Sequence, residues 1–310
     1  MQIELGGTRS QGMRDVVHLD GREEVRKKKK KIKPHEDDID LATTLVAASF
    51  YRRLRCIDYV SDYVPPSPSE FKKLQESQRW LEVLTSPVML STLGNGKIVR
   101  GFAGIPSKGP VLFVGYHMLL GLELGPLSHV LLYPGGVREA LHRKGEEYKL
   151  FWPKQSEFVR MASRFGAKII PFGTVGEDDI CQLLLDYDDQ MQIPYLKALT
   201  EEITAEVATL RTDSEGEVAN QDFYLPAVSP KLPGRFYFLF GKPIETEGRK
   251  QELRSRDKAH ELYLEVKSEV EKCLTYLKEK RESDPYRSIV SRTVYQATHG
   301  FESEVPTFEL

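Results

Sequence analysis

The sequence has few cysteines and almost no net charge. Three of its 310 residues are cysteines, Cys56, Cys181 and Cys273, and no two of them form a Cys-x-x-Cys pair. This spacing argues against a disulfide framework and against a zinc site, and it fits a reducing compartment. The formal net charge is -2 at pH 7. A broad positive field is therefore lacking, and no nucleic-acid partner is expected.

Long apolar runs and leader-like segments are also missing. A membrane-spanning helix needs about eighteen or more consecutive apolar residues, but the longest candidate, residues 118–132, is interrupted by Glu123, Pro126 and His129. We therefore expect a soluble or peripheral protein. The first residues have neither the apolar core of a signal peptide nor the acid-poor, Ser-rich character of a transit peptide. No Gly-x-Ser-x-Gly elbow occurs, which argues against a serine esterase or lipase.

Composition divides the chain into three expected parts. Residues 1–35 are polar and end near a run of lysines, a composition that cannot bury enough apolar surface to fold, so we expect a disordered basic tail. A solvated tail is favoured over a nuclear signal or a lipid contact. Residues 36–95 are expected to form a helical lead-in, in which Ser69 is an expected N-cap. Residues 96–310 are expected to form the main domain.

From residue 97 onward, apolar runs of strand length alternate with helical stretches. This alternation predicts an α/β fold with a mostly parallel sheet and covering helices. The apolar residues of the last helix should form a stripe toward the core: Leu262, Val266, Val270, Cys273, Leu274 and Leu277. Strands are expected at 97–102, 111–114, 129–133, 167–172 and 235–241, and helices at 117–126, 154–165, within 182–220 and at 256–281.

The segment Val111-Leu-Phe-Val-Gly-Tyr-His117 changes from a buried strand to a helical pattern. Open α/β sheets place their chemistry at such strand ends. An imidazole has an unperturbed pKa of about 6.5 and can take a proton from an alcohol. His117 is therefore a candidate general base, with a satisfied core histidine as the alternative.

A second strand end follows in Tyr133-Pro-Gly-Gly-Val-Arg-Glu-Ala140. Gly135 and Gly136 can expose backbone N–H groups at a helix start, where a phosphate or an oxyanion would bind. Arg138 adds a forked donor. Parallel neighbours end on the same side of a sheet, so we expect His117 and Arg138 to face one cavity. The alternative is a tight turn with a surface arginine.

Two further features are weaker signals. Pro171-Phe-Gly173 closes an apolar run, as either a plain turn or the border of a cleft. An acidic cluster suggests carboxylate ligands, but no histidine or ligand spacing supports a metal site, so solvated and helix-capping carboxylates are expected. That cluster consists of Glu177, Asp178, Asp179, Asp186, Asp188 and Asp189.

Residues 109–124, 133–153 and 170–179 resemble the acyltransferase half of the plant plastid phytyl ester synthases, which is related to diacylglycerol acyltransferase 2 and to the lysophospholipid acyltransferases. The resemblance runs from about residue 40 to residue 300. It implies a lysophospholipid acyltransferase-like fold without metal or cofactor. It also implies that His117 is the base and that the substrate-binding residues are Gly135, Gly136, Arg138, Glu139 and Pro171.

The resemblance implies an O-acyltransferase. Such an enzyme moves a fatty acyl group from acyl-CoA or acyl carrier protein to a lipophilic alcohol, phytol or diacylglycerol, and forms phytyl esters or triacylglycerol. It implies a location in the chloroplast, at plastoglobules, and leaves open a peripheral contact with a membrane or lipid-droplet surface. In many relatives an Asp follows the His by five residues, but position 122 is Leu here, and Glu123 lies on another helical face.

We expect the chain to depart from that family in two ways. The α/β-hydrolase half with its nucleophilic serine is expected to be absent, and a segment of several dozen residues that relatives have is expected to be deleted near residues 126–129. Residues 115–129 still suffice for a β–α–β crossover. We therefore expect the fold to persist with an enlarged cleft around His117. The alternative function is a catalytically impaired, truncated isoform that acts as a lipid- or partner-binding remnant.

Overall fold

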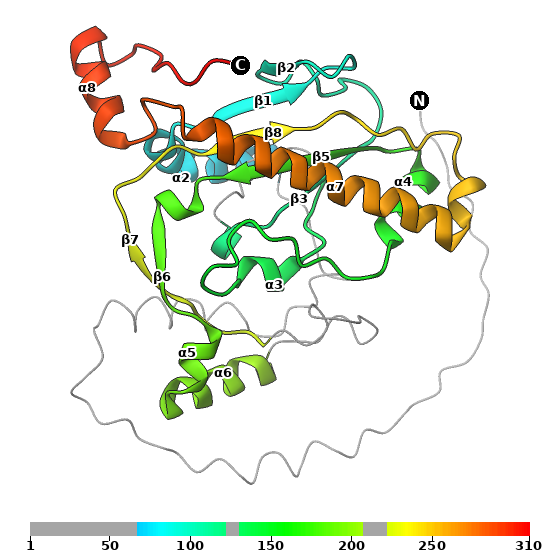
Figure 1. Cartoon of the computed structure of the whole chain (residues 1–310), viewed down its shortest axis with the longest axis horizontal. Coiled ribbons are helices and arrows are strands. Elements are labelled where there is room, and N and C mark those ends of the chain that lie inside the picture. Colours follow the sequence, from blue (N-terminus) through cyan, green and yellow to red (C-terminus); the bar gives the residue numbers. More distant parts are fainter. Residues whose placement is uncertain (1–66, 122–129, 207–221) are drawn as a thin grey trace. The chain divides into compact units, whose positions relative to one another are not determined.

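A computed structural model describes residues 67–121, 130–206 and 222–310 (Figure 1). All of these residues belong to the compact unit that spans Leu54–Leu310. The expected basic tail at 1–35 and the expected deletion joint at 126–129 lie outside the described residues. Within the described part, no helix is both long enough and apolar enough to cross a membrane.

A six-stranded sheet forms the centre of this unit. Three of its pairings are parallel, β1 with β8, β5 with β3 and β3 with β4, whereas β2–β1 and β8–β5 are antiparallel. The expected α/β fold with a mostly parallel sheet is thus confirmed. In spatial order the strands are β2 (Ile98–Arg100), β1 (Val88–Thr92), β8 (Tyr237–Phe240), β5 (Lys168–Val175), β3 (Val111–Gly115) and β4 (Val130–Leu132).

Three strands occur where none was expected. β1 lies within 36–95, so the sheet already begins inside the expected helical lead-in. Residues 181–185 form β6 (Cys181–Leu185), which pairs antiparallel with β7 (Ala227–Pro230) in a separate two-stranded sheet. The prediction of helix from residue 182 onward was therefore wrong at its start. The pairing partner lies more than forty residues away in the sequence, beyond the reach of a local pattern.

Helices follow and cover the strands. The longest, α7 (Arg256–Arg281), has the predicted bounds and contacts β5, β8 and β3, across which it runs in Figure 1. The others are α2 (Pro68–Thr85), α3 (Gly136–Ala140), α4 (Glu157–Phe165), α5 (Tyr187–Met191), α6 (Pro194–Glu206) and α8 (Ile289–His299). Short 3-10 segments occupy Leu119–Gly121, Glu177–Asp179 and Glu252–Arg254.

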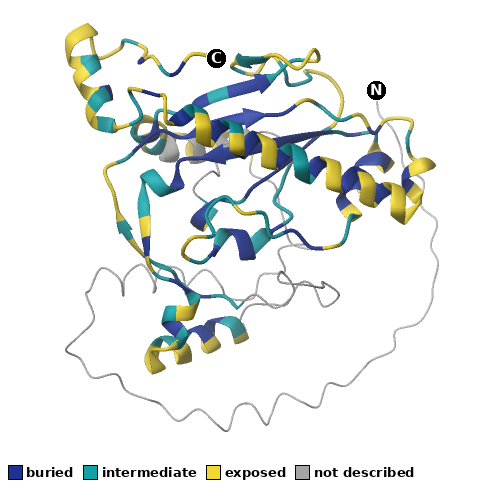
Figure 2. Ribbon diagram, in the orientation of Figure 1, coloured by how far each residue is buried: buried dark blue, intermediate teal, exposed yellow. Residues whose placement is uncertain are grey.

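The core lies between the sheet and α7. β3, β5 and β8 are buried almost without interruption, as expected for central strands that are covered on both faces (Figure 2). The predicted apolar stripe of α7 is confirmed, because all six of its residues are buried. Burial of these apolar side chains contributes most of the free energy that holds α7 on the sheet.

The N-terminus of α2 differs from the expectation. The N-cap is Ser67 rather than Ser69, and Pro68 occupies the first helical position. The Ser67 hydroxyl accepts the Glu70 N–H, while the Glu70 carboxylate accepts the Ser67 N–H at 2.8 Å, which completes a capping box. A proline at the first helical turn is favourable because its missing N–H would have no helical partner.

Replacement of Ser67 by alanine should lower the stability of the chain by about 1 kcal/mol, because the first turn loses its cap. Ser69→Ala is the matched control and should change stability by only a few tenths of that value, because Ser69 lies inside the helix. Urea unfolding followed by circular dichroism measures both. Equal losses for the two variants would contradict the capping box.

Candidate active site

His117 lies at the C-terminal end of β3, as the sequence predicted. Its half-buried ring stacks on Tyr133, the residue after β4, with ring centroids 4.4 Å apart and planes at 24°. Its main-chain N–H donates to Oε2 of Glu139 at 3.0 Å. Over residues 117–121, the described part of the expected helix, no α-helix forms. The chain instead makes the short 3-10 turn at Leu119–Gly121, with Leu120 in a left-handed conformation (φ 54°).

The strands that end before His117 and Tyr133 are neighbours in the sheet, as expected. β3 and β4 pair in parallel, with Val114 opposite Leu132. The residues that follow each strand therefore emerge at the same edge of the sheet. The stack of His117 on Tyr133 is the direct contact between these two strand ends.

Glu139 joins these strand ends through a buried carboxylate. Its side chain is fully buried, and it accepts the N–H groups of His117 (Oε2, 3.0 Å) and Phe151 (Oε1, 3.0 Å). A Cβ at Gly135 would lie 2.1 Å from Cδ of this carboxyl group. Gly135 is therefore required by the close approach of Glu139. These two hydrogen bonds hold two loops of the chain together.

Arg138 is occupied in the same way. Its guanidinium forms a two-pronged ion pair with Glu146 (Nη1–Oε2 2.8 Å, Nη2–Oε1 2.7 Å) and lies 3.8 Å from the ring centre of Phe151. Only 5% of Arg138 is exposed. Burial raises the pKa of Glu146, but the hydrogen bonds and charge of Arg138 outweigh it and leave that pKa below its ordinary value. Arg138 thus does not present a free forked donor to a substrate.

The glycine turn uses one of its N–H groups within the chain. α3 has only five residues, and the Gly136 N–H donates to the Tyr133 carbonyl at 3.0 Å. Gly136 itself has a positive φ of 48°, which an L-residue with a side chain adopts only at a cost. The turn's two glycines are therefore explained by close packing at Gly135 and by backbone conformation at Gly136.

Pro171 lies inside a strand and does not border a turn. β5 continues past it to Val175, and Pro171 is opposite Val114 of β3. Its carbonyl accepts the Gly241 N–H at 2.7 Å. Pro171 is buried in the centre of the sheet.

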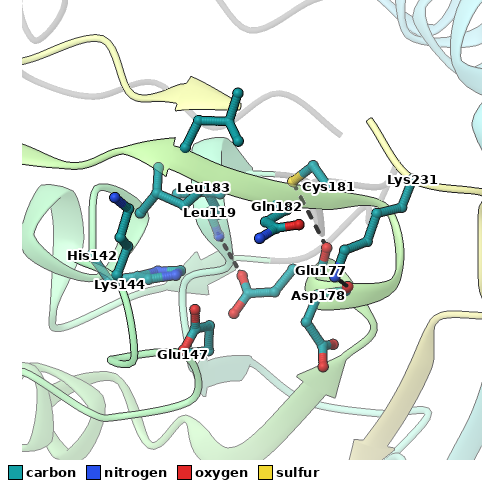
Figure 3. A pocket seen from close by; sticks show the side chains of 11 residues that line it. Leu119, His142, Lys144, Glu147, Glu177, Asp178, Cys181, Gln182, Leu183 and Lys231 are labelled. Carbon is teal, nitrogen blue, oxygen red and sulfur yellow. Dashed lines mark hydrogen bonds between the residues drawn. The ribbon is translucent and has the colours of Figure 1, made fainter. Parts of the chain in front are cut away.

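A cavity of about 470 Å³ lies beside the turn that follows His117 (Figure 3). Neither His117 nor Arg138 is among the residues that line it. Its walls come from the 3-10 turn, the segment after α3, the 3-10 segment after β5, β6 and the end of β7. The lining residues are Leu119, His142, Lys144, Glu147, Glu177, Asp178, Cys181, Gln182, Leu183, Leu184 and Lys231.

His142 is the imidazole of this cavity, and the sequence analysis did not single it out. Its Nδ1 lies 3.0 Å from the Glu139 carbonyl oxygen. A carbonyl only accepts, so Nδ1 carries the hydrogen and Nε2 is left as an acceptor. Burial lowers the pKa of His142, which keeps the ring neutral near pH 7. Glu139 thus contacts His117 through its carboxylate and His142 through its carbonyl.

Glu177 of the acidic cluster lies in the wall of the cavity and belongs to a buried hydrogen-bond network. Glu177 is 2% exposed and accepts the Tyr116 hydroxyl (2.8 Å) and the Leu119 N–H (2.6 Å). Burial, together with the charge of Glu177, raises the pKa of Tyr116 far above its ordinary value, so the hydroxyl remains protonated. The Tyr116 oxygen in turn accepts the Tyr148 N–H at 3.1 Å. Glu177 thereby fixes the turn that follows His117.

Asp178 is paired with the C-terminal end of α7. Both guanidinium Nη atoms of Arg281 lie 2.6 Å from its oxygens, and the Tyr148 hydroxyl also donates to it. The next residue, Asp179, forms a similar pair with Arg287. The prediction of solvated carboxylates was therefore wrong for these residues.

For the other part of the acidic cluster, the capping expectation is confirmed, because Asp186 and Asp189 form the capping box of α5. Asp178 and Arg281 lie 103 positions apart, so only the folded chain reveals their ion pair. Among the described residues, no group of three or more His, Cys, Asp or Glu side chains is arranged to hold a metal ion.

The Asp178–Arg281 pair should make stability depend on pH. Burial raises the pKa of Asp178, but hydrogen bonds from Arg281 and Tyr148 outweigh it and leave the pKa below the ordinary value. The pair therefore stabilises the fold above about pH 4 and loses this effect as the pH falls through the lowered pKa. Asp178→Asn should be less stable at pH 7, and its deficit should shrink below about pH 4. A deficit independent of pH in urea unfolding would contradict the ion pair.

Residues 123–270 match the model of the family described as diacylglycerol acyltransferase. The chain is 50% identical over 332 residues to phytyl ester synthase 2, chloroplastic, of Arabidopsis thaliana, covering 89% of this chain and 47% of that protein. It is 47% identical over 333 residues to phytyl ester synthase 1, chloroplastic, of the same plant, covering 88% and 47%. The chain belongs to the diacylglycerol acyltransferase-like family of the phytyl ester synthases.

This family member spans about half the length of the curated relatives it matches. The match to the family model includes the glycine turn, Arg138, Glu139 and Pro171, but it starts six positions after His117. No solved structure matches the chain.

Proposed function

We propose that this chain is an O-acyltransferase that transfers a fatty acyl group from a thioester donor, acyl-CoA or acyl carrier protein, to a lipophilic alcohol. Phytol and diacylglycerol are the proposed acceptors, with phytyl esters and triacylglycerol as products. The observation that carries the proposal is the identity of about half of the aligned residues to two phytyl ester synthases over most of this chain. The names of both relatives also support a chloroplast location. A position at plastoglobules, on their lipid surface, is part of the same proposal.

His117 is the proposed base. It takes the proton of the alcohol while that oxygen attacks the thioester carbonyl; a C–O bond forms, the C–S bond breaks, and the thiol leaves with the proton. The position of His117 at the end of β3, held by the Glu139 carboxylate, supports this role. Gly135, Gly136, Arg138, Glu139 and Pro171 are proposed to build the frame of the substrate site.

Product analysis tests the proposal. The purified chain is incubated with radiolabelled acyl-CoA or acyl carrier protein and with phytol or diacylglycerol, and lipids are separated by thin-layer chromatography. Label in phytyl ester or triacylglycerol, dependent on the added alcohol, is the expected result. Label only in free fatty acid would indicate a thioesterase, and label only in unreacted donor would contradict the proposed transfer.

A second candidate is a catalytically impaired form that binds lipid or a partner. The alignments to both relatives extend over more positions, 332 and 333, than the 310 residues of this chain. This excess supports an internal deletion in this chain, which we propose to lie near residues 126–129. A lost segment would remove part of the wall around the acceptor.

Insertion of the relative's segment at residues 126–129 separates the two candidates. If the deletion impairs catalysis, the insertion variant should synthesise phytyl ester many times faster than this chain, while a glycine–serine insert of equal length should not. Equal activity of this chain and the insertion variant would contradict the impaired form.

A further inference from the structure

The 470 Å³ cavity beside the turn after His117 has walls that combine polar and apolar groups. Its lining includes the side chains of His142, Glu147, Gln182 and Lys231, together with leucines from the 3-10 turn and from β6. An isoprenoid alcohol or a fatty acyl chain placed there would desolvate these groups without replacing their hydrogen bonds, which costs free energy. A ligand that carries both polar and apolar groups therefore matches this cavity better than a purely lipophilic chain.

The polar part of the proposed reaction is the carrier of the acyl group. Both acyl-CoA and acyl carrier protein present the thioester on a pantetheine arm, a narrow chain with two amides and a hydroxyl that ends in a phosphate ester. Such an arm needs both donors and acceptors along its length. The cavity offers His142 Nε2 and the Glu147 carboxylate as acceptors and the Gln182 amide as both donor and acceptor.

Two lysines also line the cavity from different segments, and Figure 3 shows them on opposite sides of it. Lys231 Nζ donates to the Asp178 carbonyl at 2.8 Å, which uses one of its three N–H groups. Lys144 pairs with Asp189, but this pair is half-exposed, and such pairs are weak. Either ammonium is therefore available to a phosphate.

The cavity is also close to the proposed base along the chain. Leu119 lines the cavity and follows His117 by two residues, and its N–H is fixed by Glu177 at 2.6 Å. Glu139 contacts both the His117 backbone and the His142 ring. An arm that fills this cavity would therefore place its sulfur end near the strand end that carries His117.

We propose that this cavity binds the pantetheine arm of the acyl donor, with His142 and Gln182 on its amides and Lys231 or Lys144 on its phosphate. This inference rests on the proposed acyl transfer and identifies where the donor binds. The glyceryl head of diacylglycerol is the competing occupant, and the experiment below distinguishes the two.

Cys181 provides a reporter inside the cavity. Its half-buried thiol lines the wall, whereas Cys273 is 4% exposed in the core. The rate at which N-ethylmaleimide alkylates Cys181 is followed by peptide mass spectrometry, with and without desulfo-CoA, which has the arm but no reactive thiol. Saturating desulfo-CoA should slow alkylation of Cys181 about fivefold or more, and phytol or diacylglycerol should not.

Two outcomes would overturn the inference. In the first, desulfo-CoA does not slow the alkylation of Cys181, although the chain still forms ester from acyl-CoA. This result would contradict the donor site and leave the proposed function intact. The other is protection by diacylglycerol alone. Protection by desulfo-CoA in a chain that forms no ester would support the donor site and contradict the proposed function instead.

Substitutions of the lining residues test which side chains bind desulfo-CoA. Lys231→Met should raise the dissociation constant of desulfo-CoA about five- to tenfold, as expected for the loss of one charged hydrogen bond. Lys108→Met, at an exposed turn that does not line the cavity, is the matched control. His142→Asn keeps a donor for the Glu139 carbonyl but removes Nε2, and it should also weaken desulfo-CoA binding. Unchanged affinity in both Lys231→Met and His142→Asn would contradict the proposed contacts.

Discussion

Replacement of His117 by alanine should lower the rate of ester synthesis about 100- to 10,000-fold, the range that a positioned general base contributes. The ring is half-buried and stacks on Tyr133, so the variant loses one ring contact but keeps the main-chain bond to Glu139. We therefore expect the fold to survive while the rate falls. Initial rates with labelled acyl-CoA and phytol measure the effect, and circular dichroism checks the fold.

His299→Ala is the control for this substitution. His299 is exposed on α8 and also stacks on a tyrosine, Tyr295, with ring centroids 4.1 Å apart. The His299→Ala variant therefore loses a similar ring stack but keeps the proposed base, and its rate of ester synthesis should stay unchanged. Equal rates in the His117→Ala and unsubstituted chains would show that another group takes the proton. His142 of the neighbouring cavity would then be the next residue to replace.

Replacement of Gly135 by alanine should lower the free energy of unfolding by about 3 kcal/mol. The new Cβ would lie 2.1 Å from the Glu139 carboxyl carbon and 2.3 Å from Oε1, so the carboxylate must move. Glu139 is fully buried and accepts two backbone N–H groups, from His117 and Phe151. Its displacement combines overpacking with the loss of hydrogen bonds to a buried charge. The same variant should lose most ester synthesis, because the backbone of His117 is released.

Gly136→Ala separates this clash from a general effect of glycine replacement. Gly136 has a φ of 48°, but a Cβ there would meet no atom within 4 Å. We expect a loss of about 1 kcal/mol, the cost of a left-handed L-residue. Urea unfolding curves of the two variants measure the difference. A Gly136→Ala loss as large as that of Gly135→Ala would contradict the role given to the Glu139 carboxylate.

Local patterns in the sequence predicted the elements that carry the site. The apolar run before His117 became β3 because a buried central strand is apolar on both faces. The spacing from Leu262 to Leu277 predicted α7 with its buried stripe, since helical periodicity is a property of neighbouring residues. The pairing of β3 with β4 followed from the short connection between parallel strands.

The roles of side chains within the site depended on the tertiary structure. No local sequence pattern indicates that Arg138 pairs with Glu146 and stacks on the ring of Phe151. The same holds for the close approach of the Glu139 carboxylate to Gly135. A sequence pattern shows which groups are present but not which partner satisfies each of them. Burial removes water as a partner, so polar groups must pair within the chain.

By itself, the sequence determined the α/β class, the position of His117 at a strand end and the family of the chain, because these follow from periodicity and from contiguous motifs. Only the tertiary structure decided that Asp178 pairs with Arg281, 103 positions away, and that His142 lines a polar cavity beside the turn after His117. Such contacts join distant segments. Their geometry is set by how the sheet, α7 and the β6–β7 pair pack, and packing is a property of the whole fold.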